Sequence, residues 1–474
     1  MKIKIPEIKN KERIIWVSIL ILLVLVNIKI PFIGESVSAR EKKNDDKYFN
    51  LFAGVYEIIR TRYVDSEKAV PDKLFYGAIN GMLKALDDPH TAFLDTKRYE
   101  DLKTETTGSF GGLGIYLGKR DEWLTVLYPI EGTPAWNVGV KPGDIISEIE
   151  KQSTRDMSIE EAVSILRGTP GTTVNITILR KTEDKPLNFK IKREKIEIHS
   201  TASDLIKDSS IGYIKIKTFS ATTARDLEAE ISKLKTKNIS ALIIDLRYNP
   251  GGLLDIVCDT VDFFLTEGKI VYTKGRDGQI LYEKNATPDI LVPLTVPMIV
   301  LVNNYSASAS EIFAGAMQDS GRALLLGEKT FGKFSVQEIC QIDPGEGTAF
   351  RFTTAKYYTP KGRSLHEEGL MPDIEVKEQT FSEYETGMLL KLRRGKYIEN
   401  FVSRYPEADA GEKHLKTFIE ELTANNIDVR EDTLRLFIKN ERNRNKMPDA
   451  YDLEDDLQLR EAVHLLKAYS ILKK

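Results

Sequence analysis

Three short apolar runs within residues 211–302 constrain the fold of this chain more than any other feature. The runs are IGYIKI, ALIIDLR and MIVLV, and stretches with helical patterns separate them. A strand that is apolar along its whole length is buried on both faces, as in a sheet covered by helices on each side. Residues 211–302 therefore predict an α/β domain.

A glycine pair follows the second apolar run, in the sequence YNPGG that ends at Gly252. At the carboxyl end of a strand in such a sheet, backbone N–H groups can point into a cleft. Gly251 or Gly252 is therefore a candidate donor of a hydrogen bond to an oxyanion. A plain turn is the simpler alternative.

A cluster of serines lies where the third run gives way to a helical pattern, in SASASEIFAGAMQDS. Ser308 has an alanine on either side, and the helix that begins beside it supplies free N–H groups and a favourable dipole. We take it as the candidate nucleophile. Ser306 and Ser310 are rivals in the same turn, and helix capping would explain serines there equally well.

Lys333 follows Ser308 by 333 − 308 = 25 residues, in a glycine-containing loop between Phe331 and Phe334. An amine accepts a serine proton only when burial or neighbouring groups depress its pKa, and an apolar loop could meet that need. Lys333 is therefore the candidate base, and the amide of Gln337 could orient its amine. A surface lysine is the simpler alternative.

Residues 107–193 change to short strands with glycine turns and one helix, SIEEAVSILRG. Their order resembles a PDZ domain of the bacterial protease type. In such a domain the groove between a strand and a helix takes up an extended peptide tail. The resemblance assigns tail binding to Gly112, Leu113, Gly114 and Ile115. Arg167, at the helix end, could contact a bound peptide or a neighbouring domain, or could simply be solvated.

Five basic residues precede an apolar run from Ile14 to Val26, which continues with one lysine to Ile33. This pattern predicts a secretory signal or an uncleaved membrane anchor, and a buried core helix is a third reading. We expect an exported protein, in the periplasm or on the outer face of the cytoplasmic membrane. Residues 47–103 have helical periodicity, and we take His90, in the loop after the second helix, as structural.

Composition excludes several classes of function. A net charge of −3 gives no basic excess and therefore no nucleic-acid footprint. Two cysteines and five histidines show no metal-ligand spacing, so we expect no metal, and no motif calls for an organic cofactor. Cys258 and Cys340 either pair or are buried singly. Residues 377–474 are charged and helical, without a chemical motif, and we expect an accessory segment there.

Four segments besides the PDZ-like module carry a family resemblance. They are LDDPHTAFLD from Leu86, LIIDLRYNPGGLL from Leu242, SASASEIFAGAMQDSGRALLLGEKTFGKFSVQ from Ser306 and GRSLHEEGLMPDI from Gly362. In this order they resemble the carboxyl-terminal processing, or tail-specific, proteases, a serine/lysine endopeptidase family of bacterial envelopes and chloroplast lumens. The resemblance covers about residues 48–376. Tyr248 and His366 depart from it, since the family commonly has Asn and Gln there.

The resemblance implies a multidomain α/β fold with a crotonase-like protease core and an inserted or preceding PDZ domain. The expected boundaries are a signal or anchor at 1–39, a helical segment at 40–103, the PDZ domain at 104–195, the core at 196–376 and a helical extension at 377–474. It implies Ser308 as nucleophile, Lys333 as base, Gln337 as its partner, and oxyanion donors at Ala309 and at Gly251 or Gly252.

The implied substrates are proteins or peptides with free, apolar C-termini, and a homodimer or larger assembly is expected. A catalytically silent PDZ scaffold that only binds tails is the main alternative. Acyl-CoA chemistry on the same core is a second, which the PDZ-like module and Lys333 disfavour. A Ser-His-Asp triad is disfavoured because His90, His199 and His366 lack a recognisable triad order.

Overall fold

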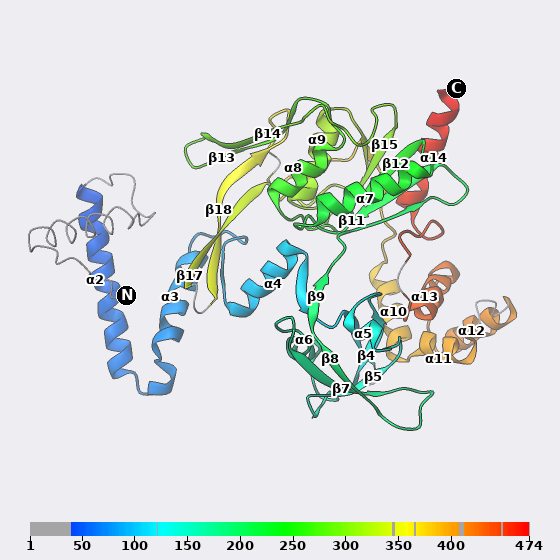
Figure 1. The fold of residues 1–474 in the computed structure, drawn as a ribbon, viewed down its shortest axis with the longest axis horizontal. Helices are drawn as coiled ribbons and strands as arrows, with labels where there is room; N and C mark the ends of the chain where they lie inside the picture. Colours follow the sequence, from blue (N-terminus) through cyan, green and yellow to red (C-terminus); the bar gives the residue numbers. More distant parts are fainter. Residues whose placement is uncertain are drawn as a thin grey trace, which may run out of the picture. The chain divides into compact units, whose positions relative to one another are not determined.

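The computed structural model describes residues 39–473 except 121, 344–346, 365, 407–411 and 447–448 (Figure 1). The chain divides into two compact units, Met1–Ala85 and Leu86–Lys474. The predicted signal or anchor lies outside the described residues. Among those that are described, no helix has both the length and the apolar character needed to cross a membrane.

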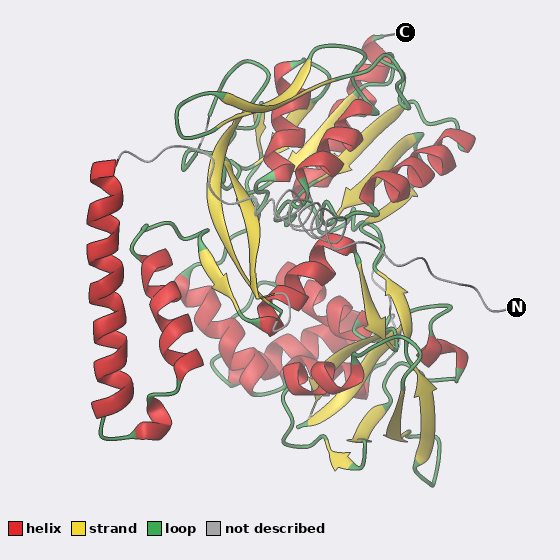
Figure 2. Cartoon of the chain, turned by 60° about the vertical axis from the view of Figure 1, so that its left-hand side comes forward, coloured by secondary structure: helices red, strands yellow, loops and turns green. Residues whose placement is uncertain are grey.

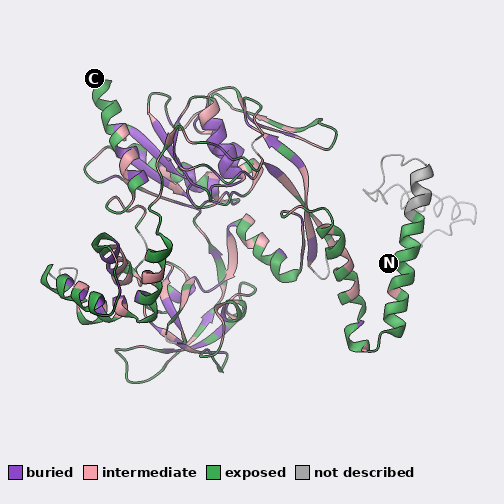
Figure 3. Cartoon of the chain, turned by 180° about the vertical axis from the view of Figure 1, so that it is seen from behind, coloured by how far each residue is buried: buried purple, intermediate pink, exposed green. Residues whose placement is uncertain are grey.

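The first unit contains two helices, α2 (Ala39–Arg62) and α3 (Pro71–Lys84), joined through a short 3-10 turn at Ser66–Lys68. Pro71 occupies the first turn of α3, where its missing N–H costs no hydrogen bond. Large apolar side chains of α2 are exposed, as the colouring of this helix in Figure 3 shows; they include Tyr48, Phe49, Leu51, Phe52, Val55 and Ile58.

Residues 201–375 contribute the strands of a six-stranded sheet, in the order β10-β11-β12-β15-β16-β19. All neighbours are parallel except the antiparallel edge pair β10·β11. This arrangement confirms the predicted α/β core. The strands are β10 (Thr201–Leu205), β11 (Ile211–Ile216), β12 (Ala241–Asp245), β15 (Met298–Val302), β16 (Leu324–Gly327) and β19 (Ile374–Glu375).

Alternate residues of these strands face two different hydrophobic layers, because side chains alternate along a strand. Ile244 and Val300 belong to the layer formed with three helices, α7 (Thr223–Thr236), α8 (Leu254–Asp262) and α9 (Ala309–Asp319). Ile243 and Leu301 belong to the opposite layer, formed with α14 (Leu457–Leu472). The sheet and its covering helices are seen in Figure 2.

A second sheet, of order β1-β18-β13-β14 with β17 paired to β18, extends beside the core. Its long hairpin, β17 and β18, begins directly after the lysine loop and contains Gln337. The strands are β1 (Ala92–Leu94), β13 (Lys269–Lys274), β14 (Ile280–Asn285), β17 (Ser335–Asp343) and β18 (Thr348–Tyr358).

The PDZ-like module has its own apolar core and a sheet of order β3-β4-β5-β7-β8, with β6 beside β5. β3 is an edge strand, and α6 (Ile159–Leu166) begins with a capping box between Ser158 and Glu161. β2 (Ser109–Gly112) and β9 (Glu194–Glu197) pair where the chain enters and leaves the module. The remaining elements are β3 (Ile115–Arg120), β4 (Trp123–Pro129), α5 (Pro134–Asn137), β5 (Ile145–Ile149), β6 (Gln152–Ser153), β7 (Thr173–Leu179) and β8 (Leu187–Lys192).

The segment after residue 376 packs in two separate groups. Helices α10 to α13 share one apolar cluster that includes Leu392, Phe401 and Leu434, whereas α14 belongs to the core sheet. We predicted one accessory extension at 377–474; its last helix is instead a layer of the α/β core. The four helices are α10 (Glu383–Arg394), α11 (Tyr397–Arg404), α12 (Glu412–Ala424) and α13 (Glu431–Asn443).

The role of α14 in the core predicts a stability difference between two leucines of that helix. Leu459 is fully buried against the sheet, whereas Leu457 is 45% exposed. Leu459→Ala should lower the free energy of unfolding of the core by about 2–5 kcal/mol, since it removes buried methyl groups and leaves a cavity. Leu457→Ala is the matched control and should cost well under about 1 kcal/mol. Urea unfolding monitored by fluorescence measures both, and equal losses would contradict the packing described.

Candidate active site

Ser308 lies between β15 and α9 in a backbone conformation that few side-chain-bearing residues adopt. Its φ is 54° and its ψ is −114°, at the residue that caps α9. Such a conformation is strained and persists only where the surroundings hold it. The strain sets Ser308 apart from the ordinary capping serine that is the simpler explanation.

The two rival serines serve structural hydrogen bonds. Ser306 Oγ donates to Leu246 O at 2.8 Å and accepts from Asn303 N at 3.0 Å. Ser310 Oγ donates to Asn249 O at 2.9 Å, and both serines are fully buried. Ser308 is only half-buried. The two outer serines thus tie the helix start to the glycine loop, and the middle one is the accessible hydroxyl.

A buried carboxylate joins the backbone of Ser308 to that of Lys333. Glu311 Oε2 accepts the N–H of Ser308 at 2.9 Å and the N–H of Lys333 at 2.8 Å. Glu311 Oε1 accepts from Thr330 Oγ1 at 2.5 Å and from Gly332 N at 2.7 Å. Four donors therefore converge on one side chain that is 0% exposed. Burial raises the pKa of Glu311, against the lowering effect of these hydrogen bonds.

Tyr357, from β18, forms a second link between the same two residues. Its hydroxyl lies 3.0 Å from Ser308 O and within hydrogen-bond distance of Lys333 O. Its ring stacks on buried Phe334, with ring centroids 4.5 Å apart. Both the N–H and the C=O groups of Ser308 and Lys333 are therefore held by shared partners, so the two backbones lie side by side.

The surroundings of Lys333 favour its neutral form. Burial lowers the pKa of Lys333 below its ordinary value of 10.5, and the charge of Arg351 lowers it further. The carboxylates of Asp88 and Glu311 act in the opposite direction. Of the two flanking aromatics, Phe334 is buried as expected, whereas Phe331 is exposed.

Gln337 does not bond to Lys333 among the described residues. Its Nε2 donates to Ser335 Oγ at 2.8 Å and lies 3.4 Å from Thr353 Oγ1. Thr353 Oγ1 in turn donates to Asp88 Oδ2 at 2.6 Å. Gln337 is thus linked through Thr353 to Asp88, whose charge raises the pKa of Lys333, and not to the amine of Lys333.

The LDDPH segment lies close to the lysine. Asp88 accepts from His90 N at 2.9 Å and Thr91 Oγ1 at 2.7 Å. Burial and then the charge of Lys333 lower the pKa of His90. These contacts agree with His90 as a residue of a structural turn, and they add that the turn borders the lysine.

The glycine loop after β12 touches Ser308 directly. A Cβ on Gly251 would lie 2.8 Å from Ser308 Cβ and 2.9 Å from Ala309 N, and its φ of 105° also favours glycine. Gly251 N–H donates to Asn249 Oδ1 at 2.9 Å. Within the described part of the chain, the N–H groups of Gly252 and Ala309 have no protein acceptor. Of the two glycines, Gly252 therefore has the N–H that is free to donate.

The residues assigned to tail binding line one pocket of the PDZ-like module. Residues 112–115 share this lining with Val163, Leu166 and Arg167 of the α6 region. Arg167 places its guanidinium 4.6 Å from the centre of the Phe110 ring and 3.5 Å from Asp101 of α4 (Thr96–Thr107). Arg167 thus contacts both the groove and the helix that leads into the module.

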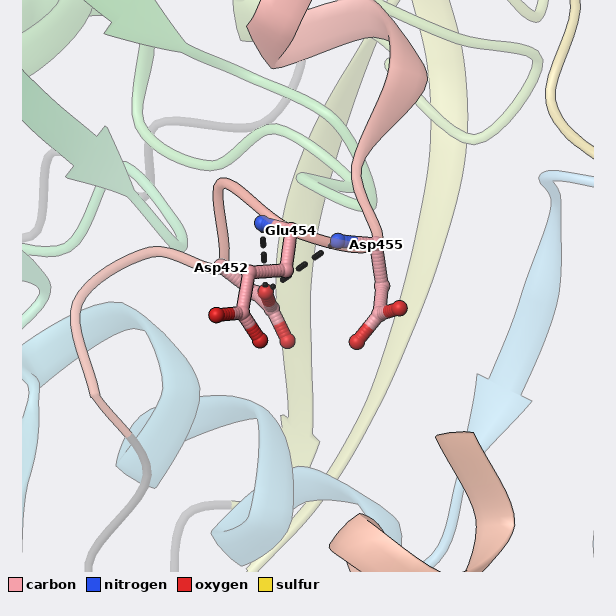
Figure 4. A group of neighbouring side chains, drawn as sticks. All are labelled: Asp452, Glu454 and Asp455. Carbon is pink, nitrogen blue, oxygen red and sulfur yellow. Dashed lines mark hydrogen bonds between the residues drawn. The ribbon is translucent and has the colours of Figure 1, made fainter. Parts of the chain in front are cut away.

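One group of carboxylates outside this region has the proximity of metal ligands. Oxygens of Asp452, Glu454 and Asp455 come within 4.8 Å of one another, and Figure 4 shows the turn that gathers them. Lys439 Nζ lies 2.9 Å, 3.1 Å and 2.9 Å from these three side chains. One ammonium group bridges all three carboxylates and offsets part of their charge, so the cluster is an ion-pair network. Cys258 and Cys340 are both free, which removes the disulfide alternative.

Sequence reasoning missed Glu311 and Tyr357. Glu311 follows Ser308 at the spacing of a capping box, Ser-x-x-Glu, which is visible in the sequence. That pattern predicts the bond to Ser308 N–H but not the bonds to the lysine loop. Nothing in the sequence around Tyr357 distinguishes it from the other aromatic residues of β18.

Comparisons with known proteins identify the family and its domains. Residues 210–376 match the model of peptidase family S41, residues 125–180 match a PDZ domain and residues 33–98 match the N-terminal domain of the activating protease CtpB. A carboxy-terminal-processing protease of Bartonella bacilliformis is 39% identical over 76% of this chain and 82% of its own length. The carboxy-terminal processing protease CtpA of Bacillus subtilis is 32% identical, covering 78% of each chain.

Among solved structures, the photosystem II D1 C-terminal processing protease is similar with a TM-score of 0.41. It is 26% identical, and the match covers 69% of this chain and 92% of that one. The curated relatives carry the assignment, because their identity and coverage extend over core and PDZ domain alike. The chain belongs to the carboxy-terminal processing proteases, serine peptidases of family S41.

Proposed function

We propose that this peptidase uses a Ser308–Lys333 dyad to cleave proteins that it captures by their C-terminal tails. One observation carries the proposal: a single oxygen of Glu311 accepts the N–H groups of both residues, which brings a strained serine and a half-buried lysine together. Burial keeps the lysine closer to neutrality, as a general base requires.

In the proposed reaction, Ser308 Oγ attacks the carbonyl carbon of a peptide bond while its proton passes to Lys333 Nζ. The carbon–nitrogen bond then breaks, and the same proton passes from Lys333 to the leaving amine. A water molecule then attacks the resulting ester and gives one proton to Lys333. Lys333 passes this proton to Ser308 Oγ as the ester carbon–oxygen bond breaks and the new carboxyl end is released. Lys333 thus starts and finishes each cycle neutral, which is why its depressed pKa supports this role.

The oxyanion formed in both steps needs preorganised donors. We assign these to the N–H groups of Ala309 and Gly252. Ala309 opens α9 beside the nucleophile, where the helix dipole favours negative charge. Asn249 occupies the N–H of Gly251, so Gly251 serves by its close approach to Ser308 instead.

The PDZ domain supplies the capture step in this proposal. β3 is an edge strand beside α6, so an extended tail can pair with it as an added strand. Residues 112–115 then receive the terminal carboxylate, and apolar groove residues favour an apolar tail. Arg167 is suited to transmit the binding of a tail in the groove to α4, since it contacts both the groove and Asp101 of that helix.

Two further parts of the proposal concern the N-terminal region. The basic and apolar residues at its start support export to the cell envelope, as a secreted or anchored enzyme. The exposed apolar side chains of α2 and α3 support a homo-oligomer, because surfaces of this kind are usually covered.

The dyad predicts that each of its members is required for cleavage. Residues 40–474 should degrade an unfolded protein with an apolar tail, and Ser308→Ala or Lys333→Ala should reduce the rate at least about 10³-fold, as for other catalytic nucleophiles and bases. Gel-based and fluorogenic assays measure this. Ser306→Ala is the control and should retain most activity. Tail binding without cleavage by the wild type would favour the silent scaffold instead.

The lysine base predicts a rise of activity with pH. Lys333 accepts a proton only when neutral, so acylation should be slow below its pKa and level off above it. Because burial lowers that pKa, the midpoint should lie below the ordinary 10.5. The measurement is the rate of Ser308 labelling by a fluorophosphonate probe between pH 5 and pH 10.5, with Ser308→Ala as the blank. A midpoint at or above the ordinary lysine value would argue against Lys333 as base.

Glu311 is predicted to position both members of the dyad without touching the substrate. Glu311→Gln keeps one acceptor but turns an NH₂ group towards N–H donors, so at least one charge-assisted hydrogen bond is lost at about 1.5–3 kcal/mol. We expect kcat to fall about 10- to 100-fold with little change in KM. Glu338→Gln, at an exposed position of β17, is the control. A Glu311→Gln enzyme with the kcat of the wild type would mean that the carboxylate is dispensable.

A further inference from the structure

The chain beyond residue 376 contacts the glycine loop through a buried arginine. Arg247, the second residue after β12, donates Nε to Asp245 Oδ1 at 3.0 Å and Nη2 to Asp245 Oδ2 at 2.7 Å. Its other edge faces Asp456, with Nη1 2.8 Å from Oδ1 and Nη2 2.5 Å from Oδ2. One guanidinium thus holds two carboxylates in bidentate pairs, the geometry in which arginine is most selective.

Asp456 is itself fixed by its own surroundings. It is the N-cap of α14, accepting from Leu459 N at 2.9 Å. Gln458, in the first turn of the same helix, accepts from Arg247 Nη1 at 3.0 Å and donates to Val376 O at 2.7 Å. The turn just before Asp456 is the acidic cluster held by Lys439 of α13 (Figure 4). The helix start therefore presents its acceptors to Arg247 from a rigid base.

Arg247 directly precedes the loop that lies against the nucleophile. Its own N–H also bonds to Asp245 Oδ1, at 2.9 Å, and the next residue, Tyr248, has a φ of 63°. A non-glycine residue in this conformation must be held there by its neighbours. The loop continues to Gly251, which touches Ser308. The orientation of Arg247 thus fixes the direction in which the loop leaves the sheet.

A second contact from beyond residue 376 acts on the other side of the loop. Glu378 Oε2 accepts from the Tyr248 hydroxyl at 2.5 Å, and Glu378 Oε1 accepts from Asn303 Nδ2 at 3.1 Å. Asn303 Oδ1 in turn accepts from Tyr248 N at 3.1 Å. Two acidic residues outside the matched protease region therefore hold the loop. Glu378 acts through Tyr248, and Asp456 acts through Arg247.

We propose that Asp456 is a positioning residue of the catalytic site, acting through Arg247 to hold the glycine loop where Gly252 N–H can meet the oxyanion. The inference rests on the proposed dyad and extends the catalytic unit to α14. Asp456 touches neither substrate nor Ser308, so its loss acts on the transition state through the loop. Substrate capture by the PDZ domain does not depend on it.

Asp456→Asn separates this role from a merely structural one. Asn is as good an N-cap as Asp, so α14 keeps its first turn. Asp245 still balances the charge of Arg247, so no buried charge is left alone. The change affects the edge of the guanidinium that faces Asp456. There an NH₂ group replaces one carboxylate oxygen, so Arg247 loses one hydrogen-bond acceptor. Glu461→Gln is the control, since it removes one charge from the same helix at a side chain that is 46% exposed.

The test measures kcat, KM and two affinities in the full chain. One ligand is a peptide boronate, whose adduct with Ser308 is tetrahedral and needs the oxyanion donors, and the other is an apolar tail peptide bound by the PDZ domain. Asp456→Asn should lower kcat about tenfold or more and weaken boronate binding by a similar factor. KM and tail affinity should stay within about twofold, and Glu461→Gln should match the wild type throughout.

Normal kcat or unchanged boronate affinity in Asp456→Asn would overturn the proposal, as would an equal loss in Glu461→Gln. A lower melting temperature with normal kcat would mean that Asp456 only stabilises the fold. An inactive wild type would instead reject the dyad, and this inference with it. If Asp456→Asn does not fold, Gln458→Asn withdraws the neighbouring acceptor from Arg247, and the same criteria apply with a smaller loss.

Discussion

The site depends on one buried carboxylate that accepts four hydrogen bonds. A fully buried Glu311 without partners would be costly in its charged form, and its neutral form could not satisfy every donor aimed at it. The four donors stabilise the charge, and in return the charge fixes where Ser308 and the lysine loop lie. Tyr357 repeats the link on the carbonyl side. The strained φ of Ser308 is tolerated because both of its peptide groups are held.

Sequence periodicity predicted the core well, because uninterrupted apolar strands have few alternatives to a covered sheet. It could not predict which helix covers the second face. The pattern of α14 shows only that one side of it is apolar, and the partner of that side is set by tertiary packing. Sequence analysis therefore predicted one accessory segment at residues 377–474, although the last helix of this segment covers one face of the core sheet.

Sequence analysis could name single candidate residues for the site, but it predicted less well which residues contact one another. Spacing and flanking residues drew attention to Ser308, whereas excluding Ser306 and Ser310 required their hydrogen bonds to Leu246 and Asn249. Gln337 follows Lys333 closely in sequence, yet its amide points to Ser335 and Thr353 because the strand fixes its direction. Pairings across long separations, such as Arg247 with Asp456, leave no local pattern at all.

The position of α14 in the chain has a consequence for when the core is closed during synthesis. Domains fold broadly in the order in which they are made, and α14 comes after every strand of the sheet in the sequence. Before α14 is made, the sheet face that includes Ile243 and Leu301 lacks its covering helix. Arg247 then pairs with Asp245 but not with Asp456. A chain in which α14 has not yet been made therefore carries Ser308 and Lys333 on a sheet that is uncovered on this face. The order of synthesis places the closing of the core after every strand of the sheet has been made.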